Sequence, residues 1–258
     1  MSWASRRRFQ YFSGFFAFLL VIIFIFIYPI IFKDPTCFDK KQNGSELGID
    51  CGGSCSLFCQ NQNKEPIILW SRAFNVTGDN YNLVALIENP NKDAAIKNIS
   101  YEFKIYDNNN LLIGTREGST YIPSNQQFAI FESRFSSGNS QLKSVTFNFT
   151  SPFIWHKKDP VLNTLPLRID NVIFSSENGS SLLTSRMTNE SIHDLKEFDV
   201  VTILYDEDYN VLNASKTYKE GILSNTSIKV MFTWPEALKK DPTFKDILPQ
   251  INPFTLSF

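Results

Sequence analysis

The chain has 258 residues, and its 25 basic and 26 acidic side chains leave a formal net charge of −1. Nucleic-acid-binding domains usually carry a basic excess on one face, so the near-neutral charge and the lack of a nucleic-acid motif argue against such a partner. The hydrophobic share of 43% and the charged share of 20% exclude a wholly disordered chain. A folded protein of one large or two modest domains remains.

The N-terminal region contains an uncharged apolar run from Phe15 to Phe32, which extends back to Tyr11. At 1.5 Å per residue, about 22 residues span ~33 Å, close to the ~30 Å of a bilayer's hydrocarbon core. We therefore predict a transmembrane helix over residues 11–32, in contact with membrane lipid. A cleaved signal peptide is the alternative, but its apolar part is only ~7–15 residues long and ends at small residues, whereas this run ends in bulky side chains.

The orientation of this helix follows from the charges beside it. Three basic residues precede the apolar run: Arg6, Arg7 and Arg8. The charges of Lys33 and Asp34, just after the run, cancel. The positive-inside rule keeps the arginines in the cytoplasm. We expect residues 1–10 to form a cytoplasmic basic tail and the chain from Lys33 onward to be extracytoplasmic, which makes this a single-pass protein of the cell membrane.

All the cysteines lie directly after this helix: Cys37, Cys51, Cys55 and Cys59. A cluster on the oxidising side of a membrane predicts disulfides, and the three possible pairings stay open. A zinc site is the alternative, but the spacing lacks the C-x2-C knuckle and the compartment does not keep thiols reduced. Residues 33–63 are therefore expected to form a small disulfide-rich stalk.

Residues 39–50 have the outline of a twelve-residue calcium loop. Asp39 stands at position 1, Asn43 at position 5 and Asp50 at position 12. Lys41 stands at position 3, where an oxygen ligand is needed, and Asp50 replaces the usual bidentate glutamate. The alternative is a polar loop held by disulfides. Calcium is the only cofactor that the sequence suggests.

The segment 37–59 resembles a short cysteine module found beside membranes and between domains in bacterial surface proteins. The resemblance rests on Asn43-Gly44, on Gly48-Ile49-Asp50-Cys51-Gly52-Gly53 and on Cys55. It implies a cell-surface setting and no specific activity.

Short apolar runs separated by turn residues follow a polar segment that ends at Pro66. The predicted strands are residues 67–76, 82–88, 96–107, 111–115, 127–135 and 145–150. Strands that recur at short intervals without a helical pattern between them predict an antiparallel sandwich.

The second half repeats the first at an offset of 99 to 100 residues. The matches are Ala73-Phe74 with Ile173-Phe174, Asn89 with Asn189, Tyr106-Asp107 with Tyr205-Asp206, and 122–125 with 222–225. We expect two homologous domains, 64–153 and 160–258, joined by a linker at 154–159 whose Trp155 sets the angle between them. The predicted fold is mainly β: one transmembrane helix, a disulfide-rich module and two tandem antiparallel immunoglobulin-like β-sandwiches.

The run Phe103-Lys104-Ile105-Tyr106-Asp107 resembles the motif of the FxLYD domain, a bacterial extracytoplasmic immunoglobulin-like sandwich related in shape to the WHy type of desiccation-linked domain. The second copy keeps Leu204-Tyr205-Asp206 but has Thr202 in place of the phenylalanine. The resemblance implies a fold in which Phe103, Ile105 and Leu204 belong to core strands, and it carries no catalytic residue. The aspartate ends a strand at a turn, where it can accept backbone hydrogen bonds.

The sequence contains few residues in patterns typical of catalysis or metal binding. Its two histidines, His156 and His193, sit in no nucleophile or metal pattern, and the common hydrolase, nucleotide and dinucleotide motifs are missing. No small-molecule substrate is evident. We therefore expect a protein that is not an enzyme.

The sequence favours a membrane-anchored protein that presents two β-sandwiches to an unknown extracytoplasmic protein partner or scaffolds the envelope. Sheet edges bind extended peptides by strand addition without special residues. The alternative is an accessory subunit of an envelope or secretion complex, assembled through a helix in which Gly14 and Ala17 form one small-residue patch. A hydrolase is the least favoured reading.

Overall fold

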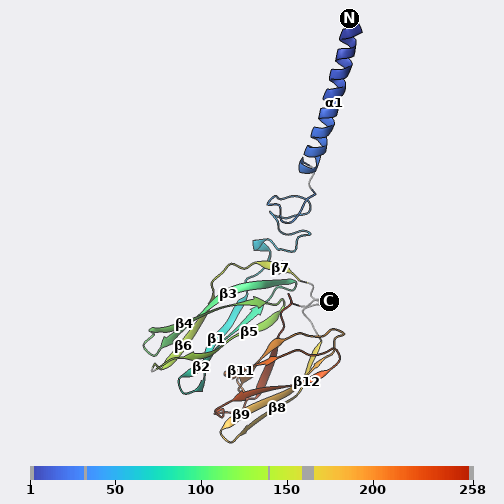
Figure 1. The fold of residues 1–258 in the computed structure, drawn as a ribbon. Coiled ribbons are helices and arrows are strands. Elements are labelled where there is room, and N and C mark those ends of the chain that lie inside the picture. Colours follow the sequence, from blue (N-terminus) through green and yellow to red (C-terminus); the bar gives the residue numbers. More distant parts are fainter. Residues whose placement is uncertain (1–2, 32–33, 139, 159–165, 256–258) are drawn as a thin grey trace. The chain divides into compact units, whose positions relative to one another are not determined.

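The computed structural model describes residues 3–31, 34–138, 140–158 and 166–255 (Figure 1). The chain divides into two compact units, residues 1–55 and 56–258. The expected domain starting at residue 160 and the end of the expected transmembrane segment at residue 32 therefore fall partly outside the described residues.

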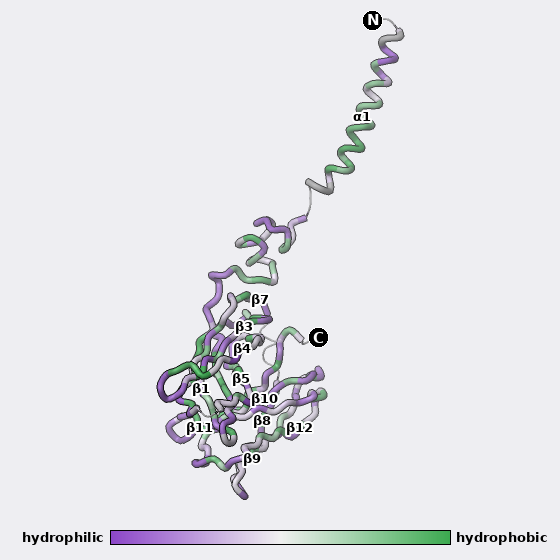
Figure 2. The backbone as a smooth tube through the Cα atoms, turned by 60° about the vertical axis from the view of Figure 1, so that its left-hand side comes forward, coloured by the Kyte–Doolittle hydropathy of each residue, from purple (hydrophilic) through white to green (hydrophobic). Residues whose placement is uncertain are grey.

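The first unit begins with helix α1, Trp3–Ile31. Its candidate membrane span is Arg6–Tyr28, and none of that span is buried against the rest of the chain. Figure 2 shows the hydrophobic colour along most of this helix. A helix that is apolar all round needs an apolar environment to cover it. Its length and composition fit a membrane anchor, and a signal sequence at the N-terminus meets the same criteria.

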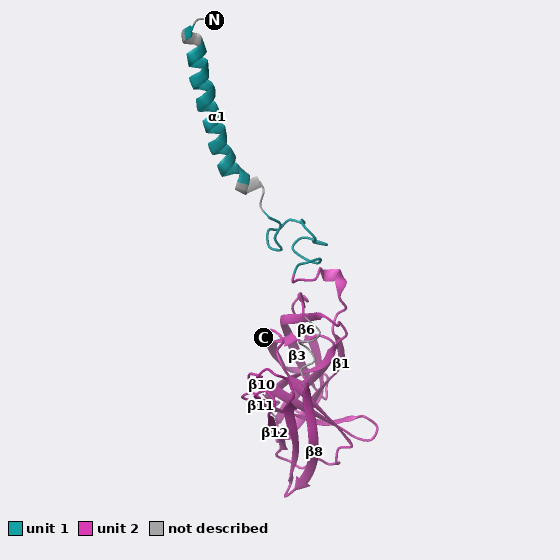
Figure 3. Cartoon of the chain, turned by 90° about the vertical axis from the view of Figure 1, so that its right-hand side faces the viewer, with its two compact units in different colours: residues 1–55 teal, residues 56–258 magenta. Residues whose placement is uncertain are grey.

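The second unit, magenta in Figure 3, opens with a 3-10 turn at Gln60–Gln62 and the first sandwich. Its strands are β1 (Ile67–Thr77), β2 (Asn80–Asn89), β3 (Ala94–Asp107), β4 (Leu112–Ile122), β5 (Gln126–Ser136), β6 (Leu142–Phe149) and β7 (Trp155–Lys157). One sheet has the order β1-β2-β5, and the other has the order β4-β3-β6 with β7 also pairing with β3. All the pairings are antiparallel.

The second sandwich repeats this topology. Its strands are β8 (Leu167–Glu177), β9 (Ser180–Asn189), β10 (Phe198–Tyr205), β11 (Val211–Lys219), β12 (Ser227–Trp234) and β13 (Phe244–Gln250). The sheet β8-β9-β12 corresponds to β1-β2-β5, and the sheet β11-β10-β13 corresponds to β4-β3-β6. The chain therefore contains two antiparallel β-sandwiches of one topology, as the internal repeat predicts.

The segment 154–159 differs from the expected linker, because it contains β7. Trp155 pairs with Ile96, is 3% exposed and packs in the core of the first sandwich. Its ring stacks on that of Phe153 with centroids 6.3 Å apart. The indole is covered by its own domain, so the expectation that Trp155 sets the angle between the sandwiches is wrong.

The chain that follows the cysteines is attached to the same strand. The Lys157 N–H donates to the Ser56 carbonyl at 2.7 Å, and the Phe58 N–H donates to the Trp155 carbonyl at 2.9 Å. Phe58 also packs against the core of the first sandwich. Leu57 therefore forms an isolated antiparallel bridge with His156 of β7, which joins residues 56–58 to the sandwich by backbone hydrogen bonds.

Besides a core in each sandwich, a third hydrophobic cluster joins the two, and we call it the docking cluster. From the first sandwich it contains Phe74, Val84, Leu86 and Ala129; from the second it contains Val201, Ile203, Tyr205 and Ala214. The sheets β1-β2-β5 and β11-β10-β13 are thus buried on both faces. This explains the unbroken apolar run from Leu83 to Ile87, because a strand covered on both sides loses its alternation.

A comparison of equivalent positions in the two sandwiches shows that the residue types match this burial. On β2, Val84 and Leu86 face the docking cluster, while the residues 100 positions later, Thr184 and Arg186 on β9, are polar. On β10, Val201 and Ile203 face it, while their counterparts 99 positions earlier are Glu102 and Lys104, an ion pair at 2.9 Å. These four positions are apolar where the sandwiches meet and polar where a sheet faces solvent, whereas Met231 and Ile173 on the free face of the second sandwich are apolar and exposed.

A buried asparagine holds the same loops together in each sandwich. Asn89, 1% exposed, donates from Nδ2 to the carbonyls of Ala94 and Pro123, both at 2.8 Å. Asn189 is fully buried and donates to the carbonyls of three residues: His193, Ile222 and Leu223. Each amide therefore ties the loop after the second strand of its sandwich to the loop after the fourth.

Replacing Asn89 by alanine will lower the free energy of unfolding by roughly 2–6 kcal/mol, because two buried carbonyls lose their donor at about 1–3 kcal/mol each. Urea unfolding followed by tryptophan fluorescence measures the change. The control is Asn98→Ala at an exposed position on β3, which should shift stability by less than about 0.5 kcal/mol. Equal effects of the two substitutions would show that the Asn89 bonds do not stabilise the fold.

Replacing apolar residues of the docking cluster by the charged residues found at the equivalent solvent-facing positions should separate the sandwiches. The double variant Val201→Glu, Ile203→Lys will lower the free energy of unfolding by roughly 3–6 kcal/mol, because two buried aliphatic side chains contribute about 1.5–3 kcal/mol each. Small-angle scattering should show a larger radius of gyration. The matched control, Thr184→Val with Arg186→Leu on the free face, should keep the wild-type dimensions. Unchanged stability in the first variant would contradict the docking.

Candidate functional site

The cysteine module is closed by disulfides. Cys37 is bonded to Cys55, Cys51 and Cys59 are also disulfide-bonded, and no described cysteine is free. Cys37, Cys55 and Glu46 form the one cluster of potential metal ligands among the described residues. Because the first two share a covalent bond, their thiolates are not available to a metal. The disulfides predicted from the sequence are therefore present, and the alternative of a zinc site with four cysteine ligands is wrong.

In the loop at residues 39–50 the carboxylates of Asp39 and Asp50 accept hydrogen bonds, whereas Asn43 Oδ1 is buried without a partner in the described structure. Asp39 accepts hydrogen bonds from the Lys41 N–H at 2.9 Å and from Asn43 Nδ2 at 2.8 Å. Both carboxylate oxygens of Asp50 lie 3.1 Å from the Lys40 nitrogen. The bond from Asn43 holds the pKa of Asp39 below its usual range.

These contacts do not fit a calcium ion. Asn43 turns its amide nitrogen, which cannot bind a cation, toward Asp39. Lys41 supplies a positive charge where an oxygen ligand is required. Backbone N–H groups of the loop already bond to both carboxylates.

The aspartates of the two FxLYD-like motifs cap turns. Asp107 Oδ1 accepts the N–H groups of Asn109 at 2.8 Å and Leu111 at 2.9 Å. Asp206 Oδ1 accepts those of Asp208 at 3.0 Å and Asn210 at 2.8 Å. The bond from Asn210 lowers the pKa of Asp206. Both side chains therefore hold the hairpin after the central strand and do not point into a cavity.

The other motif residues lie in the interior. Phe103, Ile105 and Leu204 are fully buried, Tyr106 is half-buried, and Tyr205 belongs to the docking cluster. Thr202, which replaces the phenylalanine in the second copy, is fully buried and donates from Oγ1 to the Asp246 carbonyl at 2.9 Å. A cross-strand carbonyl thus satisfies the hydroxyl that the substitution places in the core.

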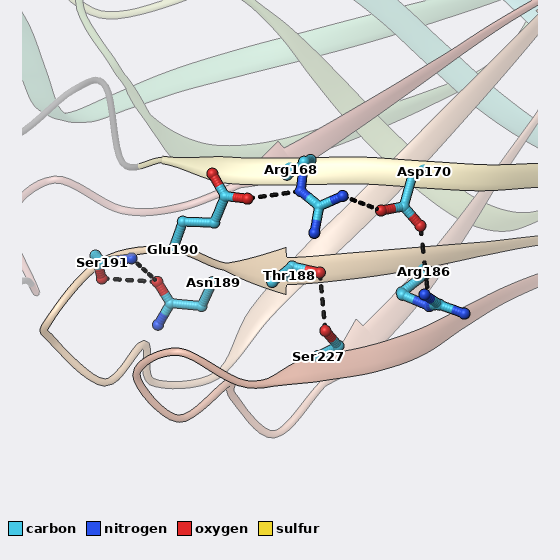
Figure 4. Close-up of polar contacts among 8 residues, drawn as sticks. All are labelled: Arg168, Asp170, Arg186, Thr188, Asn189, Glu190, Ser191 and Ser227. Atoms are coloured by element: carbon cyan, nitrogen blue, oxygen red, sulfur yellow. Dashed lines mark hydrogen bonds and ion pairs between the residues drawn. The ribbon is translucent and has the colours of Figure 1, made fainter.

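A polar network lies on the free face of the second sandwich (Figure 4), beside the exposed apolar side chains of Ile173 and Met231. Arg168 bridges Glu190 at 2.6 Å and Asp170 at 2.7 Å, and Arg186 lies 3.8 Å from the other oxygen of Asp170. The charges of these four residues cancel. Both arginines are more than half exposed, so each pair contributes at most about 1 kcal/mol. This network lies on a solvent-exposed sheet face, and its paired charges do not suit catalysis.

The largest cleft among the described pockets lies between the sandwiches and has a volume of about 640 Å³. The first sandwich contributes residues 119–121 of β4 and 128–133 of β5; the second contributes residues 196–199, Lys216 and Gln250, among others. β4 and β5 are edge strands of their sheets. The cleft therefore opens along the side of the first sandwich, where the docked second sandwich forms its other wall.

Each wall of this cleft carries ion pairs or hydrogen bonds of its own, and Lys196 and Glu197 add one charge of each sign to the wall of the second sandwich. Tyr101 donates its hydroxyl to Glu132 at 2.7 Å, and Arg116 lies 3.5 Å from the other oxygen of Glu132. Lys216 and Asp199 form an ion pair at 3.1 Å. Burial raises the pKa of Tyr101 and of Tyr121, so both phenols stay neutral at ordinary pH. Neutral hydroxyls and paired charges suit binding better than proton transfer.

The histidines do not join this cleft. His156 lies on β7, where burial and the charges of Lys97 and Lys158 lower its pKa, and its ring contacts Phe254. His193 lies in the loop whose carbonyl accepts a hydrogen bond from Asn189. Neither residue is among those that line the described pockets.

Sequence reasoning did not find the docking cluster or the cleft. The residues expected to carry function belong to a helix flank, a disulfide loop and two structural motifs. Arg6, Arg7 and Arg8 are exposed and lie in α1. The available signal was the loss of alternation in Leu83–Ile87 and Val200–Leu204, which indicates a second covered face.

No family model matches this chain, and no curated protein matches it either. Among solved structures it is similar to red sea bream transglutaminase (10% identity, TM-score 0.22, 70% of this chain and 31% of that chain). It is also similar to a β-glucuronidase from glycoside hydrolase family 2 (12%, 0.21, 86% and 25%) and to a chaperone–tip adhesin complex of CFA/I fimbriae biogenesis (11%, 0.19, 70% and 97%). The chain spans less than a third of the length of the transglutaminase and of the β-glucuronidase. Similarities with TM-scores this low carry no functional inference.

Millimolar calcium will leave the Tm of the full-length protein unchanged within about 1 °C, because the oxygens of Asp39 and Asp50 already accept hydrogen bonds from the loop. Differential scanning fluorimetry with calcium and with EDTA measures this. A calcium-dependent rise of several degrees that disappears in Asp50→Ala would show that the loop binds the ion.

Proposed function

We propose that this chain is a non-enzymatic, single-pass protein of the cell membrane that presents two docked β-sandwiches to an extracytoplasmic protein partner. One observation carries the membrane part: the apolar span of α1, Arg6–Tyr28, buries none of itself against the chain. Leaving such a helix in water is unfavourable, whereas a bilayer covers it completely. The arginines at its start favour a cytoplasmic N-terminus.

The docking cluster supports the binding part of the proposal. Two sheets packed through a shared apolar layer hold their edges and loops in fixed relative positions, which lowers the entropy cost of binding a partner. The disulfides of the cysteine module and the pairing of residues 56–58 with β7 connect the helix to the sandwiches through a short stalk.

Protease protection on sealed membranes tests the membrane part. The full-length protein carrying one epitope tag before Met1 and a second after Phe258 is treated with protease outside the cell membrane. The proposal predicts that the C-terminal tag is lost, the N-terminal tag is protected, and carbonate extraction leaves the protected fragment in the membrane. An N-terminal tag missing from the mature protein would instead establish a cleaved signal sequence.

Crosslinking and pull-down from native membranes test the binding part. The full chain is compared with a chain that begins at Lys33. A partner kept by both supports binding through the sandwiches. A partner lost with the helix contradicts it and favours the accessory-subunit alternative, in which Gly14 and Ala17 would pack against another helix.

A further inference from the structure

Strand β5 has one open side. It pairs with β2 from Asn89↔Gln126 to Asn80↔Ser136, and it stands at the end of the sheet order β1-β2-β5. Within the described chain no strand pairs with its other side, and its consecutive residues 128–133 line the cleft. On that side Phe128, Ala129 and Ile130 are at most 4% exposed, Phe131, Glu132 and Ser133 are more open, and Arg116 donates to the Ser133 carbonyl at 3.3 Å. An edge without a partner strand is a template for one more strand.

A second observation in the same cleft points to a missing partner. Gln250, at the end of β13, is only 7% exposed and lines the cleft. Its Nε2 donates to the Leu248 carbonyl at 3.3 Å, but its Oε1 is buried and accepts no hydrogen bond in the described structure. Buried polar atoms are rarely left in this state. A ligand that brings an N–H or O–H group would satisfy this oxygen.

The charges of the cleft indicate what that ligand is. Asp199 is paired with Lys216, and Glu132 is held by Tyr101 and Arg116. Lys196 and Glu197 also line the cleft, and with Arg116 counted its three acidic and three basic side chains cancel. A charged ligand would compete with these pairs, whereas a neutral ligand leaves them intact. The volume of about 640 Å³ is that of a ligand site, and six residues of β5 extend over roughly 20 Å. Length, hydrogen bonding and charge together favour an uncharged extended peptide over a compact molecule.

We propose that an uncharged, extended peptide segment of a protein partner binds in this cleft by adding as a fourth strand to the edge of β5, with an N–H group donated to Gln250 Oε1. This inference rests on the proposed binding function and assigns its site.

The contact between the two sandwiches also determines which residue types the bound peptide needs. On β5, Phe128 and Ile130 belong to the core of the first sandwich, and Ala129 belongs to the docking cluster. Because side chains alternate along a strand, those of an added strand would face the same two layers in turn. One set would meet the rings of Tyr101 and Tyr121, and the other would meet the wall of the second sandwich. We expect apolar or aromatic residues on both sides and no charge in the central positions.

Panning a random octapeptide display library on the full-length protein in detergent micelles tests the proposal. Enriched peptides should be uncharged and bind with affinities that fluorescence anisotropy can measure. Gln250→Leu removes the unpartnered acceptor, so it should keep the wild-type Tm while weakening an enriched peptide about tenfold. Ser119→Trp places a ring in the cleft lining and should abolish binding. Thr115→Trp, on the same strand outside the cleft, should bind like wild type.

Hydrogen exchange separates strand addition from other modes of binding. A bound peptide should slow exchange of amides in residues 128–133 and leave β12, the equivalent edge of the second sandwich, unchanged. The proposal is overturned if no peptide is enriched, if enriched peptides bind Ser119→Trp normally, or if chitohexaose, a neutral oligosaccharide, protects the cleft while peptides do not. If Ser119→Trp still captures the protein partner of the wild type, the cleft assignment fails and the proposed function stands; if the wild type captures none, the proposed function fails.

Discussion

The apolar contact between the sandwiches is the constraint on which the rest of the second unit depends. An antiparallel sheet normally keeps one face in solvent, and its strands then alternate between apolar and polar residues. Here the sheets β1-β2-β5 and β11-β10-β13 each have a core on one face and the docking cluster on the other. The position of the cleft follows from this contact, because one wall of the cleft belongs to each sandwich. Gln250, whose buried Oε1 accepts no hydrogen bond in the described structure, lines the same cleft.

The contact joins unlike sheets of two like domains. The first sandwich uses its β1-β2-β5 sheet, and the second uses the sheet that corresponds to β4-β3-β6. A head-to-tail contact of this kind can in principle propagate to further copies. Polar residues at the two ends stop it: Glu102 and Lys104 on one free face, and Thr184 and Arg186 on the other. Repeat proteins end their arrays with polar caps in the same way.

Much of the architecture could be predicted from local patterns. The apolar helix, the disulfide cluster, the strands and the repeat all follow from spacing along the chain. The docking could not be predicted in this way, because alternation shows which face of a strand is apolar but not what covers it. Trp155 was misplaced for the same reason: its position in the sequence suggested a junction, while β7 returns it to the core of the first sandwich.

The repeat itself is less regular than a fixed offset suggests. Phe174 pairs with Leu183, whereas Phe74 pairs with Asn82, so Phe174 occupies the place of Ala73. The register shift between Asp170 and Ile173 accounts for this, since an extra residue in one strand reverses the faces of the residues beyond it. The result places Phe174 in the core of the second sandwich and Phe74 in the docking cluster.

Scanning calorimetry of the full-length protein tests the central claim most directly. If the docking cluster makes the two sandwiches one cooperative body, both will unfold in a single transition whose calorimetric and van't Hoff enthalpies agree. Two separate transitions, or a calorimetric enthalpy about twice the van't Hoff value, would show that the sandwiches unfold independently and would contradict the account.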